Sequence, residues 1–336
     1  MRTHREGRSI VATAVAEPTT AVKEDEGGIV GRSPAQLAWR RFRKDRVGVI
    51  ALGVSAFFLL SSALAQVICG LMGLDPQQPN QQLLNYDEVG PFGGISWQHP
   101  FGLEPGLGRD LFARILYGSQ ISFTVAFLTT FLTLFIGMVI GMVSGYLGGF
   151  VDTAIGRVID FLMAFPGFFM IIALAEPAVN RLENLGIPKL EGNVARVTML
   201  IMFFVFFGWT GFARLIRSQV LSLRERDFVT AAQALGAPSR RIVFKELMPN
   251  LWPPVIVFAS NALPGYLGAE AAFSYLGIGV QQPQSTWGTI LAEASVYWQT
   301  NPTYFWIPGG MLFIIVLSFN LVGDAVRDAL DPKSDR

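Results

Sequence analysis

The sequence predicts an all-α integral membrane protein with six transmembrane helices. Of the 336 residues, 51% are hydrophobic and 15% are charged, and the mean hydropathy is +0.42. A soluble globular chain carries roughly 25% charged residues. A helix needs about 20 predominantly apolar residues to cross a hydrocarbon core about 30 Å thick. Six windows meet this requirement: 47–70, 119–146, 157–176, 196–215, 251–273 and 305–323.

The overall charge and the metal-binding residue types argue against several functions. A formal net charge of +1 provides no basic field for nucleic acid, so no nucleic-acid partner is expected. The single Cys69 permits no internal disulfide, and we interpret it as a small apolar residue near a helix end. With only His4 and His99 beside it, no metal-ligand cluster can be assembled from soft ligands, and we expect no metal site.

The N-terminal region is expected to anchor the chain at the membrane. Residues 1–34 have the composition of a disordered cytoplasmic tail. Residues 35–70 would form an anchor region followed by the first transmembrane helix. Within this region, the stretch "AWRRFRKDR" (38–46) places five cations directly before the first apolar window: Arg40, Arg41, Arg43, Lys44 and Arg46.

The positive charges orient the predicted helices. With a cytoplasmic N-terminus, six spans place the N-terminal tail, the loops near residues 150 and 230 and the C-terminal tail 327–336 inside. These segments hold 21 of the 26 Lys and Arg residues, as the positive-inside rule requires. We therefore expect both termini in the cytoplasm, with residues 119–326 forming the main transmembrane domain.

An extracytoplasmic loop with an interfacial helix is predicted at residues 71–118. Apolar side chains between Leu111 and Leu116 have the spacing of a helix that lies along the membrane surface. Arg109 and Arg114 would stand on its polar side, and the helix would form a rim, with Arg109 and Asp110 as its docking residues, where an extracytoplasmic binding protein docks. The alternative is an amphipathic lead-in that only stabilises the second span.

Glycine and proline shape the middle spans. Glycines recur at every fourth position from 137 to 149, which places them on one helix face and favours close approach of a second helix: Gly137, Gly141, Gly145 and Gly149. The third window carries Pro166, which is expected to kink it or to mark backbone that lines a cavity. Asp160 in the same window is expected to pair with Arg157, three residues earlier.

Residues 222–250 predict a rigid cytoplasmic elbow of two short helices. Ser222 and Glu225 have the spacing of a capping box, and the apolar face of the first helix follows with helical periodicity: Phe228, Ala231, Ala232 and Leu235. Gly236 would supply a left-handed cap. The second helix would then run to Pro249, with arginines at the rim of a partner surface: Arg224, Arg226, Arg240 and Arg241. A helix lying on anionic lipid would explain the arginines but not the alanines or the elbow.

This elbow resembles the EAA loop of importer-type ABC permeases, through "DFVTAAQALGAPSRRIVFKELMPN" (227–250). Other segments narrow the resemblance: "HPFGLEPGLGRDLFARILYGSQIS" (99–122), "GYLGGFVDTAIGRVIDFLMAFP" (145–166), "EAAFSYLGIGVQQPQSTWGTILAEA" (270–294) and "FNLVGDAVRDALDPK" (319–333). Together they look like the longer-N-terminus, C-type permease subunit of dipeptide and oligopeptide transporters.

The resemblance covers residues 35 to 333 and implies a type I ABC importer permease fold in the bacterial inner membrane. The implied partners are the lipid bilayer, a second homologous permease, two cytoplasmic ATPases and an extracytoplasmic peptide-binding protein. ATP and Mg would bind to the ATPases, and this chain would hold no cofactor. The implied ATPase-coupling residues are Arg226, Asp227, Phe228, Thr230, Ala231, Ala232, Leu235, Gly236 and Pro249.

Two departures from the family pattern stand out. The acidic residue at the head of the family's loop is Thr230 here, so a carboxylate role in the partner contact does not carry over to that position. The segment 176–196 is longer and more polar than the short connection that the family suggests.

Other functions remain as alternatives. The same architecture could import nickel or another small solute, because a separate binding protein selects the substrate. A secondary transporter would need intramembrane ionisable groups, for which Asp160 and Glu270 are the candidates. Glu270 would face either the translocation cavity or the outside water. An enzyme is not expected, because the chain lacks a nucleophile–base pair, and no lysine follows a glycine as a P-loop requires.

Overall fold

The computed structural model describes residues 34–80 and 94–331, and this part of the chain is helical apart from its connections and one isolated β-bridge. The predicted tail at residues 1–34 lies outside it except for Pro34, which begins α1, and the last five residues also lie outside it. The α-helices are α1 Pro34–Lys44, α2 Arg46–Ala63, α3 Ala65–Met72, α4 Leu111–Leu147, α5 Gly149–Ala164, α6 Gly167–Glu183, α7 Asn193–Arg224, α8 Asp227–Ala234, α9 Ser239–Arg241, α10 Trp252–Tyr275, α11 Trp287–Ala294 and α12 Pro302–Leu330.

The predicted apolar windows coincide with helices of membrane-spanning length. Five are long and apolar enough to cross a membrane on their own, and the bent pair α5 and α6 meets the same criterion together, as a broken span or a re-entrant loop. The two helices of this pair meet at 81°. Phe165 between them is extended, with φ −83° and ψ 134°, because a residue before proline avoids the helical region. The expected kink at Pro166 is therefore confirmed.

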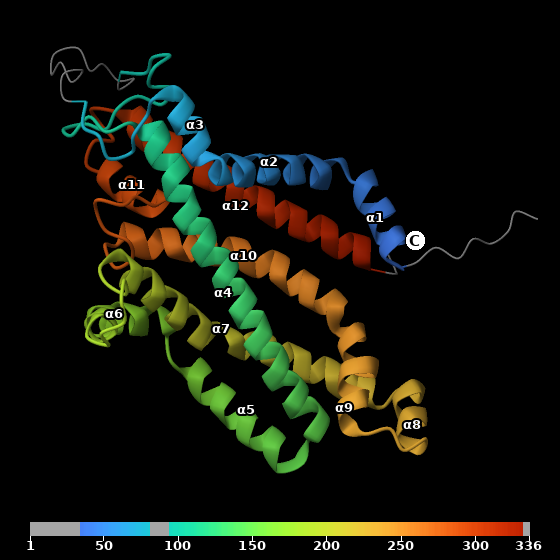
Figure 1. The fold of residues 1–336 in the computed structure, drawn as a ribbon. Helices are drawn as coiled ribbons and strands as arrows, with labels where there is room; N and C mark the ends of the chain where they lie inside the picture. Colours follow the sequence, from blue (N-terminus) through green and yellow to red (C-terminus); the bar gives the residue numbers. More distant parts are fainter. Residues whose placement is uncertain (1–33, 81–93, 332–336) are drawn as a thin grey trace, which may run out of the picture.

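The spans alternate in direction, as the sequence predicts (Figure 1). Helix α1, helix α8 and the C-terminal end of α12 lie at one end of the molecule. Helices α3, α6 and α11 lie at the opposite end, and α4 crosses the others diagonally. Helix α12 continues to Leu330, into the segment 327–336 predicted as the C-terminal tail.

Helices α4 and α7 share the closest interface, and glycines make it possible. A Cβ atom on Gly137 would lie 2.9 Å from the Trp209 carbonyl oxygen, and one on Gly141 would lie 2.6 Å from the Ala213 carbonyl oxygen. Gly145 meets α7 one turn later in the same way. The packing seam is confirmed for these three residues. It is wrong for Gly149, which begins α5 at φ +55° with no atom near its Cβ position.

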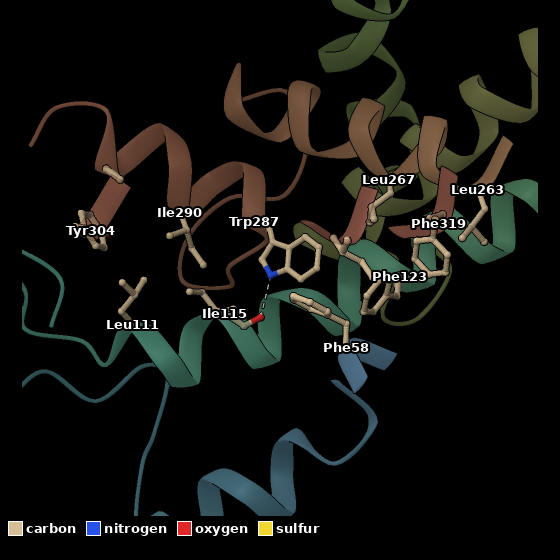
Figure 2. Packing of buried hydrophobic residues seen from close by; sticks show 13 residues of the cluster. Phe58, Leu111, Ile115, Phe123, Leu263, Leu267, Trp287, Ile290, Tyr304 and Phe319 are labelled. Carbon is tan, nitrogen blue, oxygen red and sulfur yellow. Dashed lines mark hydrogen bonds between the residues drawn. The ribbon is translucent and has the colours of Figure 1, made fainter. Parts of the chain in front are cut away.

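The largest cluster of buried hydrophobic residues in the described part of the chain joins α2, α4, α10, α11 and α12 (Figure 2). The fully buried Trp287 of α11 lies at its centre, and its indole N–H donates to the Ile115 carbonyl oxygen at 3.2 Å. Phe58 of α2 and Phe123 of α4 contact the indole edge to face. This cluster fixes α11, which is too short to span a membrane, against the long helices α4, α10 and α12.

Candidate functional site

The elbow at residues 222–250 begins differently from the prediction. Helix α7 continues to Arg224, with Glu225 as its C-cap, so Ser222 lies inside a helix and the predicted capping box is wrong. Helix α8 begins after Arg226, which has an extended backbone and accepts hydrogen bonds from the N–H groups of Val229 and Thr230. The long α7 and the short α8 are therefore separated by a two-residue turn, and α8 projects beyond the spans (Figure 1).

Gly236 ends α8 as expected. Its φ is +75°, a left-handed conformation that side chains with a Cβ rarely adopt. The Gly236 N–H donates to the Gln233 carbonyl at 2.9 Å, and the Ala237 N–H donates to the Ala232 carbonyl at 3.0 Å. These two bonds form a complete Schellman motif, which satisfies the carbonyls at the helix end.

The second limb does not stop at Pro249. It begins at Ser239 as α9, continues as a π-helical segment Ile242–Leu247 and a 3₁₀ turn Met248–Leu251, and leads directly into α10. Pro249 takes an early position in the 3₁₀ turn, where a backbone N–H would have no partner within the helix, so the lack of an N–H in proline costs no hydrogen bond. The predicted helix end at Pro249 is therefore wrong, and the elbow is joined to α10 without a loop.

The predicted apolar face of α8 points away from the protein. The side chain of Phe228 is 40% exposed and that of Leu235 is 88% exposed, and Ala231 between them is also exposed. The sequence analysis missed the residue that attaches α8, the fully buried Val229, which packs into a cluster with Ile242 and other residues of the second limb and α7. The elbow thus has a firm inner contact and a solvent-facing apolar stripe.

Charged groups frame this stripe. Arg226, Arg240 and Arg241 are exposed, as a partner rim would require. Arg224 instead donates to the carbonyls of Gly145 and Tyr146 at 3.5 Å and so ties the start of the elbow to the end of α4.

Within α8, Asp227 lies in the first turn, where its charge suits the helix dipole. The Thr230 hydroxyl donates to the Asp227 carbonyl at 3.0 Å. Thr230 thus makes a local helix bond, and its side chain faces solvent.

An ion pair that the sequence analysis missed holds the neighbouring turn. The Arg217 Nη2 atom of α7 donates to the Asp152 Oδ2 atom of α5 at 2.6 Å, and Arg217 Nε contacts the other carboxylate oxygen. Such a two-point pair fixes orientation as well as distance. The pair lies beside the α4–α5 turn and joins α5 to α7, the helix that leads into the elbow.

At the opposite end, Arg109 and Asp110 do not form an exposed rim. Their exposed fractions are 5% and 0%, and residues from Leu111 onward are the first turns of α4, not a separate interfacial helix. The Asp110 Oδ1 atom accepts from the Ala113 N–H at 2.7 Å as the N-cap of α4, and Oδ2 lies 2.7 Å from His99 Nδ1. The predicted interfacial helix and its exposed polar side are therefore wrong.

The arginines there belong to a buried ionic network. Arg109 Nη2 donates to Glu104 Oε1 at 2.7 Å. Arg114, which is 0% exposed, lies 3.0 Å from Glu104 and 2.7 Å from Glu293 of α11. Tyr304 of α12 donates to the same Glu293 at 3.1 Å. The network balances two cations with two carboxylates and joins the loop before α4 to α11 and α12.

The two carboxylates predicted for the translocation pathway lie in different surroundings. Glu270 is 0% exposed and accepts from Ser274 at 2.7 Å, so the alternative that it faces outside water is wrong, while its pathway role stays a prediction. Asp160 pairs with Arg214 of α7 at 2.7 Å instead of with Arg157. Both side chains of this pair are more than half exposed, and a pathway role for Asp160 stays a prediction.

Comparisons with known proteins agree with this architecture. Residues 137–336 match the family model described as binding-protein-dependent transport system inner membrane component, and residues 33–91 match the N-terminal TM domain of oligopeptide transport permease C. The chain is 32% identical to the dipeptide transport system permease protein DppC of Alkalihalophilus pseudofirmus, over 94% of this chain and 95% of that protein. It is 35% identical to the glutathione transport system permease protein GsiD of Salmonella paratyphi A, over 90% and 91%.

Among solved structures, the chain is similar to the inward-facing MetNI methionine ABC transporter. The identity is 19% and the TM-score is 0.48, over 66% of this chain and 98% of that one. The sequence matches, together with the apolar spans, show a multi-pass membrane permease and not an enzyme. The chain belongs to the family of binding-protein-dependent transport system inner membrane components.

Proposed function

We propose that this chain is one permease subunit of an ATP-driven importer for dipeptides and oligopeptides. The names of its relatives support this substrate class, since one transports dipeptides and another glutathione, itself a tripeptide. In this proposal, a second homologous permease completes the translocation pathway, and an extracytoplasmic binding protein delivers the peptide. ATP and Mg bind to two cytoplasmic ATPase subunits, and this chain converts their motion into a change of access.

The observation that carries the coupling role is the solvent-facing apolar stripe on α8. Phe228 and Leu235 expose large apolar surface on the elbow, which is unfavourable in water unless a partner covers it. Val229 fixes α8 to the core, and α7 and α10 lead from the elbow into the spans. A push on the elbow would therefore reach two spans directly.

The contact with the ATPase would use the outer surface of the elbow. The proposed coupling residues are Arg226, Asp227, Phe228, Thr230, Ala231, Ala232, Leu235, Gly236 and Pro249. Small alanines beside Phe228 leave room for a bulky partner side chain, while the exposed arginines supply charge complementarity at the rim.

A Gly236→Val substitution is expected to abolish coupling while leaving the subunit in the membrane. A β-branched residue cannot adopt φ +75° without strain, so the Schellman turn would open and α8 would lose its position. The measurement is peptide uptake by cells that express the complete transporter, normalised to the amount of inserted subunit.

The matched control is Ala234→Val, two residues earlier in α8, at an exposed position with ordinary helical backbone. This variant should retain most uptake. Normal uptake by the Gly236→Val transporter at normal expression would remove the elbow from the coupling mechanism.

We further propose that the end of the molecule with α1, α8 and the end of α12 is cytoplasmic. A cysteine at Ser239 should then resist a membrane-impermeant thiol reagent in intact cells, whereas cysteines at Pro76 and Gln284 should react. Pro76 and Gln284 line one small cavity of about 270 Å³ at the opposite end. The native Cys69 is buried, so the parent chain provides a low background. Labelling at Ser239 but not at Gln284 would invert this topology.

A further inference from the structure

Helix α1 carries a group of exposed cations that have no partner among the described residues. Arg40, Arg43 and Lys44 are exposed, and their side chains make no ion pair or hydrogen bond with the part of the chain that the structure describes. Arg41 differs, because its guanidinium donates to the Asp331 carbonyl at 3.1 Å. Three positive charges within five residues add up to a positive local potential, which favours binding of an anion.

The inner face of the same helix is apolar and attached to the spans. Phe42 is buried against Ala325 and Ala329 of α12. The Trp39 ring stacks on Phe42 with centroids 5.8 Å apart and an interplanar angle of 9°, yet Trp39 is 56% exposed. A large amphipathic ring held partly in the open is typical of the boundary between lipid headgroups and acyl chains.

An apolar groove of about 330 Å³ opens beside Trp39. Four helices contribute to it, because Leu52 of α2, Ile256 of α10 and Val322 of α12 face α1 across it. Leu52 and Ile256 are 39% and 40% exposed, so the groove is accessible from the lipid side. Its lining is almost entirely hydrocarbon, which suits an acyl chain and offers nothing to a free phosphate ion.

The place of α1 in the chain sets its depth in the membrane. The apolar span α2 begins at Arg46, two residues after α1 ends, and Asp45 caps its N-terminus. Helix α1 therefore lies where this span enters the bilayer, at the level of the headgroups. Arg40 and Arg43 each directly follow a residue that lines the groove, Trp39 and Phe42. Arginine side chains are long enough to reach a headgroup at the mouth of the groove.

From these observations, we propose that α1 and its groove form a binding site for an anionic phospholipid. One acyl chain occupies the groove beside Trp39, and the phosphate lies against Arg40, Arg43 and Lys44. A zwitterionic lipid could fill the groove but would gain little from the three cations. Because this site lies outside the elbow and the proposed pathway, its existence does not depend on the transported solute.

The proposal is tested with brominated lipids, which quench tryptophan fluorescence on contact. The purified full chain is placed in phosphatidylcholine nanodiscs that contain an increasing fraction of brominated phosphatidylglycerol, and the Trp39 signal is obtained by subtracting a Trp39→Phe sample. Each cation near an anionic surface contributes about fivefold in affinity, so an Arg40→Gln/Arg43→Gln/Lys44→Gln variant should bind on the order of 100-fold more weakly. High salt should also weaken the binding of phosphatidylglycerol to the parent chain, because salt screens the three cations.

Two controls separate this site from general attraction to an anionic surface. The variant Arg157→Gln/Arg240→Gln/Arg241→Gln removes the same number of exposed charges at other places and should leave the quenching curve unchanged. Leu52→Phe narrows the groove and should reduce quenching at constant charge. Equal curves for the parent and the α1 triple variant, or equal quenching by brominated phosphatidylcholine, would overturn the proposal.

Discussion

Replacing Arg114 with leucine is expected to produce the largest loss of stability of any single change in this chain. The guanidinium lies within 3.0 Å of Glu104 and 2.7 Å of Glu293, and it also donates to Ser285 at 3.0 Å. Without it, the buried Glu104 and the partly buried Glu293 share only Arg109. Breaking a buried ion pair by removing one partner costs about 3–5 kcal/mol. The measurement is the thermal unfolding midpoint of the purified chain in detergent, together with the yield of folded protein.

Two further variants make this result specific. Arg114→Lys keeps the positive charge but loses the planar guanidinium that bonds two carboxylates at once. Its thermal unfolding midpoint should therefore lie between those of the parent and Arg114→Leu. Arg181→Leu removes an exposed arginine that makes no ion pair with the described residues, and it should leave the midpoint unchanged. If Arg114→Leu unfolds at the same temperature as the parent, the network does not hold α4, α11 and α12 together.

The second large effect is expected from Gly141→Ala in the seam between α4 and α7. The added methyl would lie 2.6 Å from the Ala213 carbonyl oxygen and 2.8 Å from the Ile216 Cβ atom. Both atoms are fixed by the α7 backbone, so the two helices must separate. Overpacking of this kind typically costs about 1–3 kcal/mol, and fixed neighbours favour the upper end of that range. Denaturant unfolding in mixed micelles measures the loss.

Gly156→Ala in α5 is the matched control, because no atom lies within 4 Å of its Cβ position. Alanine is the better helix former by about 1 kcal/mol, so this variant should be as stable as the parent or more stable. The two glycine changes should therefore shift stability in opposite directions. A similar shift for both would mean that the seam is looser than its geometry indicates.

Features that depend on local sequence could be predicted. Apolar windows revealed the spans because length and hydropathy alone decide whether a helix can cross a bilayer. The Gly236 cap and the Pro166 break were also predictable, since a glycine after a periodic run and a residue before proline each restrict their own backbone. The spacing of Gly137, Gly141 and Gly145 revealed a contact face, although not that α7 would occupy it.

Features that depend on distant partners could not be predicted. Arg109 and Arg114 looked like surface cations because Glu293, which neutralises Arg114, lies far along the chain. Their burial follows only once α11 is folded onto α4. The face of α8 was misleading for a different reason, since its regular apolar spacing suggested a packed side, whereas the neighbouring Val229 makes the packing contact. The apolar spacing of a helix face that binds another protein is the same as that of a face packed in the core, so sequence alone does not distinguish them.

The winding of the second limb has a mechanical consequence. Between Ser239 and Trp252 the backbone changes from α to π and then to 3₁₀ before α10 begins. A π turn holds more residues than an α turn, and a 3₁₀ turn holds fewer. The two adjacent segments therefore shift the angular positions of the residues around the helix axis in opposite directions. Moving one hydrogen bond across Leu247 would turn α9 relative to α10 by about 100°, the rotation of one residue in an α-helix, with little change in length. We therefore expect a displacement of the elbow to change the rotation of α10 about its own axis through this segment, and not only the position of α10.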